Sequence, residues 1–465
     1  MAKNRQIETQ APKLRAVLIG IQLPQTSDAE VKASVAELAR LVTTLGYDVV
    51  GELYQKRNSD REATVLGDGK LAELAQWTGG TGKVSPTFVK KKHRAALKFK
   101  KNLSDESNEE SSTDDPDEDS DHEHPQADVV VFDCDLSPSQ LRNVESATGA
   151  SVLDRTGVII EIFSRHAKTR TARAQVEIAR LSYVAPRLRE TGGSDDQQGG
   201  GGKGAGETSL ELDKRKIRDR IKELKDELAA LGSEQDVRRQ RRNQEATVAL
   251  VGYTNAGKSS LMRALTGSEV LVANKLFATL DTTVRVLHPE SVPRILISDT
   301  VGFIKKLPHD LVASFKSTLD EASHASLLLY VVDSSDETFE SQLEVTKNVL
   351  SEVGASDLPS YLIMNKSDCL SPERKLSLQQ KYPDAIFLSA HQPSDVSMLH
   401  QKLVEFFSKG MVETDILIPY QAKGAIGEIR TFARVISETY KNEGTMFRVS
   451  AFQADLDKFK ARHGI

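Results

Sequence analysis

The chain has 465 residues, more than the roughly 250–300 at which one hydrophobic core stops growing, so we expect about three domains. Its hydrophobic content of 38% and charged content of 28% suit a soluble globular protein with polar segments. No apolar run approaches the ~18 residues of a membrane span and the first residues lack the apolar core of a signal peptide, so we expect a cytoplasmic protein, and a monomer.

The formal net charge of -5 comes from one short tract. Residues 103–125 hold eleven Asp or Glu and no Lys or Arg, so the rest of the chain carries a net charge of +6. A mildly basic remainder permits a polyanionic partner without requiring one.

Residues 14–163 alternate between strand-like and helix-like segments. After the apolar run 14–24, a 3–4 spacing predicts a helix that is capped by Asp28 and closed by Gly46. Its inward face would carry Val31, Val35, Leu38, Leu41, Val42 and Leu45. Further segments follow at 47–53, 67–74, 129–137, 137–149 and 151–163. The alternation predicts an α/β domain, residues 1–163, with a parallel or mostly parallel sheet covered by helices.

A charged insertion interrupts this domain at about residues 79–126. Its acidic part, 103–125, has no aromatic residue and cannot bury enough surface to fold, so we expect it to be disordered. Its basic part, 89–101, has two interpretations: a solvated tail that leans on the acidic tract, or a contact with RNA.

Residues 164–245 are expected to form an antiparallel, coiled-coil-like helical hairpin. The second helix would present a heptad seam of Ile217, Ile221, Leu224, Leu228 and Leu231. The first helix would meet it with Ala172, Val176, Ala179 and Tyr183. The first helix also carries a basic stripe, which is either a solvated face or a binding surface: Arg165, Lys168, Arg170, Arg173 and Arg180.

A glycine-rich loop at residues 199–206 separates the two helices. An antiparallel hairpin needs only two to five loop residues, so this loop is longer than closure requires. It is either a flexible linker or a contact in its own right.

The segment after residue 245 predicts a phosphate-binding loop. A buried-type strand at 246–251 leads into Gly252, Gly257, Lys258 and Ser259, which satisfy G-x-x-x-x-G-K-S, and a helix follows. Backbone N–H groups of such a loop wrap phosphates, the lysine reaches the β- and γ-phosphates, and the serine hydroxyl binds Mg²⁺. We assign phosphate contacts to Gly252, Tyr253, Thr254, Asn255, Ala256, Gly257, Lys258, Ser259 and Ser260, together with Gly302.

Two later strand ends resemble the guanine-reading motifs of GTPases. Asn365, Lys366 and Asp368 form N-K-x-D, in which Asp368 would accept from guanine N1 and the exocyclic amine, which adenine does not present in that way. Asn365 would contact the purine edge and tie back to the loop, and the Lys366 stem would lie along the base. Ser389 and Ala390 would place a backbone N–H on guanine O6. The order of motifs predicts a GTPase domain at residues 246–410, with its ligand at the carboxyl ends of the strands.

Two segments are expected to sense the γ-phosphate. Switch II would comprise Asp299, Thr300, Val301, Gly302 and Phe303, with Asp299 holding the Mg²⁺ shell through water. A switch I threonine must supply a hydroxyl to Mg²⁺, and Thr279, Thr282 and Thr283 are candidates. Switch I would comprise Phe277, Ala278, Thr279 and Leu280, which resemble the same segment of ribosome-associated GTPases and favour Thr279.

Phe303 raises a question about catalysis. Many GTPases have a glutamine after the D-x-x-G glycine that orients the attacking water. A phenyl ring cannot do this, so the water-positioning group is unknown. Residues 411–465 add a strand, a helix, a strand pair turning at 442–444 and a closing helix, which predict a small α+β domain without chemistry of its own.

Taken together, these elements resemble the HflX family of ribosome-associated GTPases. The resemblance is carried by residues 165–181, 204–217, 277–285 and 299–315, and extends from about Leu14 to the C-terminus apart from the insertion. The chain departs from the family in the insertion and at Ala205, where a proline is usual.

The resemblance implies a set of ligands and partners. It implies GTP and GDP as ligands, Mg²⁺ as cofactor, and a low intrinsic turnover that rises on the 50S ribosomal subunit. A hydrophobic residue such as Phe303 is usual in the family. The family contacts rRNA with the hairpin and with the loop formed by Gly199, Gly200, Gly201, Gly202, Lys203, Gly204, Ala205 and Gly206. This binding would push the subunits apart and so split or rescue stalled ribosomes under stress.

Several alternatives stay open. Asn255 could hold K⁺ beside the phosphates or merely shape the loop. The turn Gly67–Lys70 could meet a phosphate, as ATP binding by some family members suggests, or be a tight turn before a helix. An ATP-driven RNA remodeller and a non-enzymatic GTP-gated scaffold are the competing functions.

Overall fold

The computed structural model describes residues 13–84, 126–188, 209–242, 245–267, 276–277, 283–306, 321–422 and 424–465. The chain divides into two units, Met1–Ile162 and Phe163–Ile465. Among the helices described, none is both long and apolar enough to cross a membrane.

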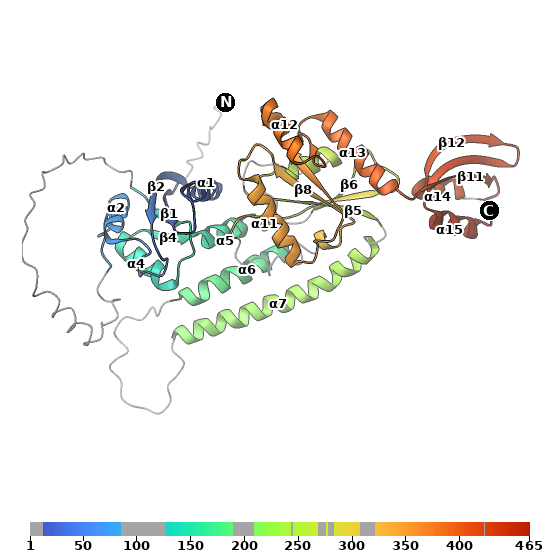
Figure 1. The fold of residues 1–465 in the computed structure, drawn as a ribbon. Coiled ribbons are helices and arrows are strands. Elements are labelled where there is room, and N and C mark those ends of the chain that lie inside the picture. The colour runs from blue at the N-terminus through green and yellow to red at the C-terminus, as the bar shows by residue number, and fades with distance from the viewer. Residues whose placement is uncertain are drawn as a thin grey trace, which may run out of the picture. The chain divides into compact units, whose positions relative to one another are not determined.

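The first unit contains a parallel sheet of strand order β2-β1-β3-β4. Its strands are β1 (Arg15–Gln22), β2 (Asp48–Lys56), β3 (Val129–Phe132) and β4 (Ser151–Asp154). Its helices are α1 (Asp28–Thr44), α2 (Asp68–Thr78), α4 (Pro138–Thr148) and α5 (Arg155–His166), the last of which ends in the second unit. Strands and helices alternate along the chain (Figure 1), which confirms the predicted α/β class.

Helix α1 has the predicted inward face but a different cap. All six residues of the predicted face are buried. The cap is Ser27 and not Asp28, because Ser27 and Glu30 form a reciprocal capping box in which each side chain accepts the other's backbone N–H. Asp28 lies in the first turn, where its carboxylate accepts from Lys56.

The structure defines two other segments of the predicted alternation more closely. Residues 151–163 contain both a strand and a helix, since β4 ends at Asp154 and the apolar run after it lies in α5. The Asp154 carboxylate accepts the Gly157 N–H at 2.7 Å, as a helix-starting side chain does. The turn at Gly67–Lys70 is mostly helix, since α2 begins at Asp68 with Gly67 as its N-cap.

A buried ion-pair cluster lies at the carboxyl edge of this sheet. Arg155, at the start of α5, is 1% exposed. Its guanidinium donates to Asp133, after β3, at 2.6 Å and also to Glu37 on α1. Ser34 donates to the same Asp133 carboxylate at 2.6 Å. The cluster therefore ties α5, α1 and the end of β3 together within the first unit.

The second unit begins with the helical hairpin α6 (Arg170–Val184), η2 (Ala185–Arg187) and α7 (Ser209–Arg242). Figure 1 shows α6 and α7 side by side. Ion pairs from Arg170 to Glu227 and from Arg220 to Glu177 show that the two helices run antiparallel, as predicted.

The contact face of α6 differs from the prediction. Ala174 and Ile178 pack against Leu224, with Ile221 and Leu228 beside them, so the middle of the predicted α7 seam is correct. The predicted α6 residues Ala172, Val176 and Ala179 are also buried, but they lie outside this cluster. Because α6 is buried on more than one side, its apolar residues do not form a single stripe. Their spacing therefore did not predict which face contacts α7.

The central domain of this unit is a six-stranded sheet of order β10-β9-β8-β5-β7-β6, parallel except for β6. Its strands are β5 (Ala246–Val251), β6 (Thr283–Val286), β7 (Ile295–Asp299), β8 (Leu327–Asp333), β9 (Ser360–Asn365) and β10 (Ile386–Phe387). Its helices are α8 (Lys258–Thr266), α11 (Phe339–Glu352), η3 (Ser367–Cys369), α12 (Pro372–Lys381) and α13 (Pro393–Ser408). The near-continuous apolar strands β5 and β8 are buried at its centre.

The last part of the chain is a small α+β domain, as predicted. The antiparallel sheet has the order β11-β13-β12, with β11 (Val412–Pro419), β12 (Arg434–Lys441) and β13 (Gly444–Ala451). Helices α14 (Ala425–Phe432) and α15 (Gln453–His463) pack on it around Ile416, Phe447 and Phe459.

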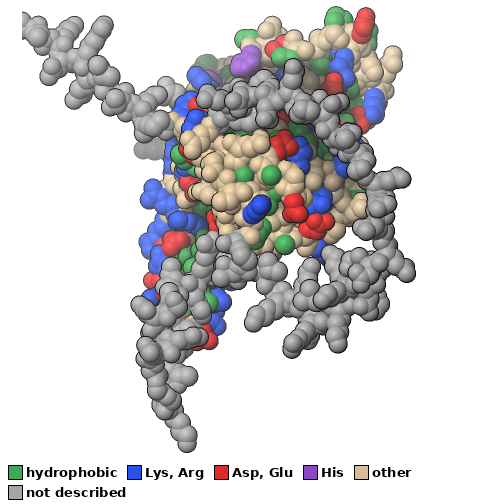
Figure 2. Space-filling model, turned by 90° about the vertical axis from the view of Figure 1, so that its left-hand side faces the viewer, with side chains coloured by type: hydrophobic (Ala, Val, Ile, Leu, Met, Phe, Trp, Pro, Cys, Tyr) green, Lys and Arg blue, Asp and Glu red, His purple; other side chains and the backbone are tan. Residues whose placement is uncertain are grey.

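On the face shown in Figure 2, hydrophobic side chains of the described residues show only in small, separate areas.

Candidate functional site

Polar residues collect where the strands of the central sheet end. Parallel strands bring their carboxyl ends to one edge, which is where open α/β sheets bind ligands. Each of five parallel strands contributes a residue at or just after its end: Gly252, Asp299, Asp333, Asn365 and Ser389.

The loop from Gly252 to Lys258 needs its glycines. Gly252 and Gly257 have φ of +149° and +91°. A Cβ on Gly252 would lie 2.2 Å from the Val331 carbonyl oxygen, and one on Gly257 would lie 2.2 Å from Asn365 Nδ2. Asn255 is exposed with φ of +60°, a left-handed conformation that asparagine tolerates better than most residues. The loop conformation therefore explains the residue types at Gly252, Asn255 and Gly257.

Lys258 is enclosed by this loop. Its Nζ donates to the carbonyls of Gly252 at 3.0 Å and Tyr253 at 2.8 Å, and the residue is 6% exposed. Burial lowers the pKa of Lys258 to about 8, against the opposing effect of Asp299. A buried ammonium of this kind is stabilised by an anion placed beside it, as phosphate would be.

Ser259 and Asp299 bring two oxygen ligands together. The Ser259 hydroxyl donates to an Asp299 carboxylate oxygen at 2.7 Å. Asp299 is fully buried at the end of β7. A hydroxyl and a carboxylate beside a phosphate-binding loop are the hard oxygen donors that Mg²⁺ prefers, so these residues fit that ion. Thr254 Oγ1 adds a buried polar atom without a hydrogen-bond partner among the described residues.

The switch II segment lies directly on the loop. The Thr300 hydroxyl donates to the Leu250 carbonyl at 2.7 Å, which fixes the segment to β5. Phe303 is 2% exposed, and its backbone N–H and C=O bond to Gly252 and Thr254. Its ring is therefore buried in the protein.

Only part of switch I can be located. Phe277 is buried and packs against Phe163, whereas Ala278, Thr279, Leu280 and Thr282 lie outside the described residues. Thr283 opens β6 and pairs with Asp299 in the ladder between β6 and β7. The choice of Thr279 thus stays a prediction.

The N-K-x-D residues are tied to the phosphate-binding loop. Asn365 Nδ2 donates to the Ala256 carbonyl at 2.8 Å, and Asn365 Oδ1 accepts the Ala390 N–H at 3.2 Å. One side chain thus joins the loop, β9 and the segment after β10. A hydrogen bond from the Ser389 hydroxyl lowers the pKa of Asp368 and keeps it an acceptor. A role for Ala390 on guanine O6 stays a prediction, because its N–H has this protein partner.

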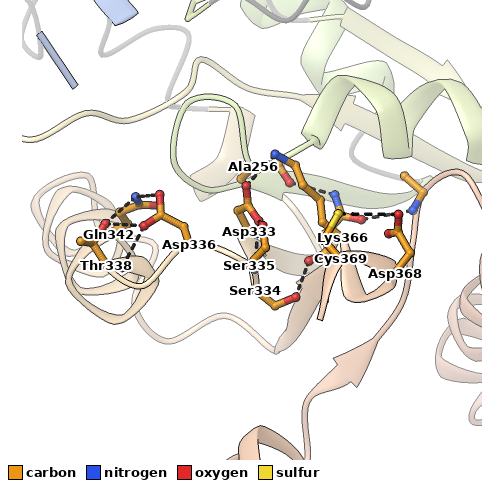
Figure 3. Close-up of polar contacts among 12 residues, drawn as sticks. Ala256, Asp333, Ser334, Ser335, Asp336, Thr338, Gln342, Lys366, Asp368 and Cys369 are labelled. Atoms are coloured by element: carbon orange, nitrogen blue, oxygen red, sulfur yellow. Dashed lines mark hydrogen bonds and ion pairs between the residues drawn. The ribbon is translucent and has the colours of Figure 1, made fainter. Parts of the chain in front are cut away.

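Two further residues, Asp333 and Asp395, position this edge and were missed in the sequence. Lys366 Nζ donates to Asp333, at the end of β8, at 2.6 Å, and Asp333 also accepts from Ser335 (Figure 3). The Ser389 N–H donates to Asp395 on α13 at 2.9 Å. Asp333 could have been recognised in the sequence because it closes the apolar run of β8, whereas no local pattern marks Asp395.

Other predicted contacts lie outside the described residues. These are the rRNA-contacting loop, Gly199–Gly206, and most of the charged insertion. Of the predicted basic stripe, Arg173 and Arg180 on α6 are exposed, as is Lys168, which lies between α5 and α6. In the first unit, the Gly67 N–H donates to Gln55 and the Lys70 ammonium pairs with Glu73, so both of these donors have partners within the protein.

Three family models match the chain. A model described as GTP-binding GTPase N-terminal matches residues 32–88 and 119–164, and one described as GTP-binding GTPase Middle Region matches residues 166–242. A third, described as 50S ribosome-binding GTPase, matches residues 247–366. The interruption in the first match falls within the charged insertion.

Curated relatives are similar over most of their length. The chain is 56% identical to GTPase HflX of Gluconacetobacter diazotrophicus, over 98% of this chain and 99% of that one. It is 35% identical to GTPase HflX of Escherichia coli, over 88% and 86% of the two chains. Among solved structures, a GTP-binding protein from Sulfolobus solfataricus in complex with GDP is 22% identical with a TM-score of 0.42, over 85% of this chain and 99% of that one.

Proposed function

The chain belongs to the HflX family of GTPases, and from this premise we propose that it is a ribosome-stimulated enzyme that hydrolyses GTP to GDP and phosphate and splits or rescues stalled ribosomes under stress. It would turn over slowly by itself and faster on the 50S subunit. We expect it to act in the cytoplasm, as a monomer.

The observation that best supports the proposed binding of a guanine nucleotide is the arrangement of the Asn365 side chain. It links Ala256 of the phosphate-binding loop to Ala390, with Lys366 and Asp368 beside it. A carboxylate at Asp368 suits guanine, whose N1 and exocyclic amine are both donors. The same edge thus brings together the residues proposed to bind the phosphates and those proposed to bind the base.

The residues at the phosphate end would bind the nucleotide and its cation. Lys258 and the loop N–H groups would hold the phosphates, and the Gly302 N–H would meet the γ-phosphate. Ser259, Thr279 and, through water, Asp299 would hold Mg²⁺, which neutralises phosphate charge when bound. Asn255 would either add K⁺ beside the phosphates or only shape the loop.

The burial of Phe303 supports a low intrinsic rate. Because the Phe303 side chain cannot position the attacking water, the site would rely on a group from its partner, and stimulation of this kind is worth ~10³–10⁵-fold in other GTPases. The exposed basic side chains of α6 and the loop Gly199–Gly206 would contact rRNA on that partner.

The two competing functions make different predictions. An ATP-driven RNA remodeller would unwind RNA even after Lys258→Ala. Its phosphate site would be the segment Gly67–Lys70, where the Gly67 N–H and the Lys70 ammonium already bond to Gln55 and Glu73. A GTP-gated scaffold would bind ribosomes on GTP binding alone, without dissociating them.

The test is GTP turnover with and without purified 50S subunits, for the wild type, Lys258→Ala and a variant lacking Gly199–Gly206. We expect strong stimulation of the wild type, loss of all turnover in Lys258→Ala, and loss of stimulation alone in the deletion. An unstimulated wild type would refute the ribosomal proposal, while its basal turnover would still support GTP hydrolysis.

A further inference from the structure

Residues Gly302–Lys305 lie on the phosphate-binding loop like a short parallel strand. The Thr254 N–H donates to the Phe303 carbonyl at 2.8 Å, and the Phe303 N–H donates to the Gly252 carbonyl at 3.2 Å. Tyr253 and Phe303 form an isolated parallel bridge. Backbone bonds therefore join the γ-phosphate sensor to the loop that binds the phosphates.

A tyrosine side chain adds a third bond to this contact. The Lys305 N–H donates to the Tyr253 hydroxyl at 2.6 Å. Tyr253 is 4% exposed, so its ring is held by packing and its hydroxyl has a fixed position. Of the three bonds, only this one depends on a side chain, and it can be removed without changing the backbone.

The segment closes the γ-phosphate end of the loop. A Cβ on Gly302 would lie 2.8 Å from Thr254 Cγ2 and 3.1 Å from Lys258 Nζ. The lysine of such a loop reaches the β- and γ-phosphates. The Gly302 backbone thus lies close to the place that a γ-phosphate needs, whereas the α- and β-phosphates are bound within the loop itself. A γ-phosphate that binds the Gly302 N–H would therefore move the segment from the position it holds here, whereas GDP would leave it in place.

We propose that Tyr253 is a positioning residue that holds Gly302–Lys305 against the phosphate-binding loop and thereby weakens the binding of GTP relative to that of GDP. The inference rests on the proposed binding of guanine nucleotides at this loop. Binding of GTP opens the contact and breaks the hydrogen bond between Lys305 and Tyr253, while binding of GDP leaves it intact. A partner that withdraws Lys305 would favour the GTP-bound form by the same route.

The test compares nucleotide affinities of the wild type and Tyr253→Phe. Fluorescent GDP and a fluorescent non-hydrolysable GTP analogue are titrated with Mg²⁺ present. Loss of one hydrogen bond predicts about threefold to tenfold tighter binding of the GTP analogue and a change below about twofold for GDP. Tyr361→Phe removes a tyrosine hydroxyl from β9, outside this contact, and should change neither affinity.

Hydrogen exchange gives an independent readout of the contact. In the GDP complex, the Lys305 amide should exchange faster in Tyr253→Phe than in the wild type. In the wild type it should exchange faster with the GTP analogue than with GDP. Equal shifts of both affinities, or an unchanged Lys305 amide, would overturn the inference while nucleotide binding still stands. A wild type that binds neither nucleotide would overturn the proposed function as well.

Discussion

Phe277 meets Phe163 edge-on, with ring centroids 4.5 Å apart and ring planes at 90°. Phe277 has φ of +58° and begins the predicted switch I, while Phe163 lies on α5 and both rings are buried. The contact anchors one end of the segment that carries Thr279, two residues further on. A segment that is already held at one end by an aromatic contact loses fewer conformations when it binds a ligand.

Replacing this anchor should weaken binding of GTP more than binding of GDP. Phe277→Leu keeps apolar bulk but loses the edge-to-face geometry, which is worth about 0.5–1.5 kcal/mol in such pairs. We expect the affinity for a non-hydrolysable GTP analogue to fall by about twofold to tenfold, with GDP little changed. Phe163→Leu should have the same effect, and the double variant should add little. Additive losses in this double-mutant cycle would contradict the coupling.

Asp333→Ala should weaken GDP and GTP alike. It removes the acceptor that holds Lys366 at 2.6 Å, and so frees the stem expected to lie along the base. Because the base side does not sense the γ-phosphate, both nucleotides should bind about tenfold more weakly, chiefly through faster dissociation. Ser335→Ala is the matched control, since it leaves the pair of Lys366 and Asp333 in place. An effect confined to GTP would count against this role.

Arg155→Met should destabilise the first unit. It leaves the buried carboxylates of Glu37 and Asp133 without their cation, which costs about 3–5 kcal/mol of unfolding free energy. Trp77, the chain's single tryptophan, lies on α2 and reports urea unfolding of this unit by fluorescence. Arg40→Met, at an exposed position on α1, should cost less than about 0.5 kcal/mol. Equal losses in the two variants would show that the cluster is not stabilising.

Asn255→Gly separates the two interpretations of that residue. Glycine adopts φ near +60° readily, so the variant keeps the loop conformation but lacks the amide oxygen. If Asn255 holds K⁺, wild-type GTP turnover should be faster in K⁺ than in Na⁺ at equal ionic strength, and the variant should lose that difference with nucleotide affinity retained. Equal wild-type rates in both salts would leave Asn255 with a loop-shaping role alone.

Local patterns in the sequence were enough to predict the buried face of α1 and the nucleotide-binding motifs. The buried face of α1 follows from a 3–4 spacing within one helix. The phosphate-binding loop and the N-K-x-D segment follow from residue types at fixed spacings, each at a strand end. Such features can be predicted because the residues that identify them lie close together along the chain.

Tertiary structure alone decided the contacts between distant segments. The pairing of Lys366 with Asp333 spans 33 positions, and that of Lys305 with Tyr253 spans 52. The face that α6 turns to α7 also emerged only on packing, because α6 is buried on more than one side. Spacing shows that a residue is suited to burial, but the partner it meets is set by how strands and helices pack in three dimensions.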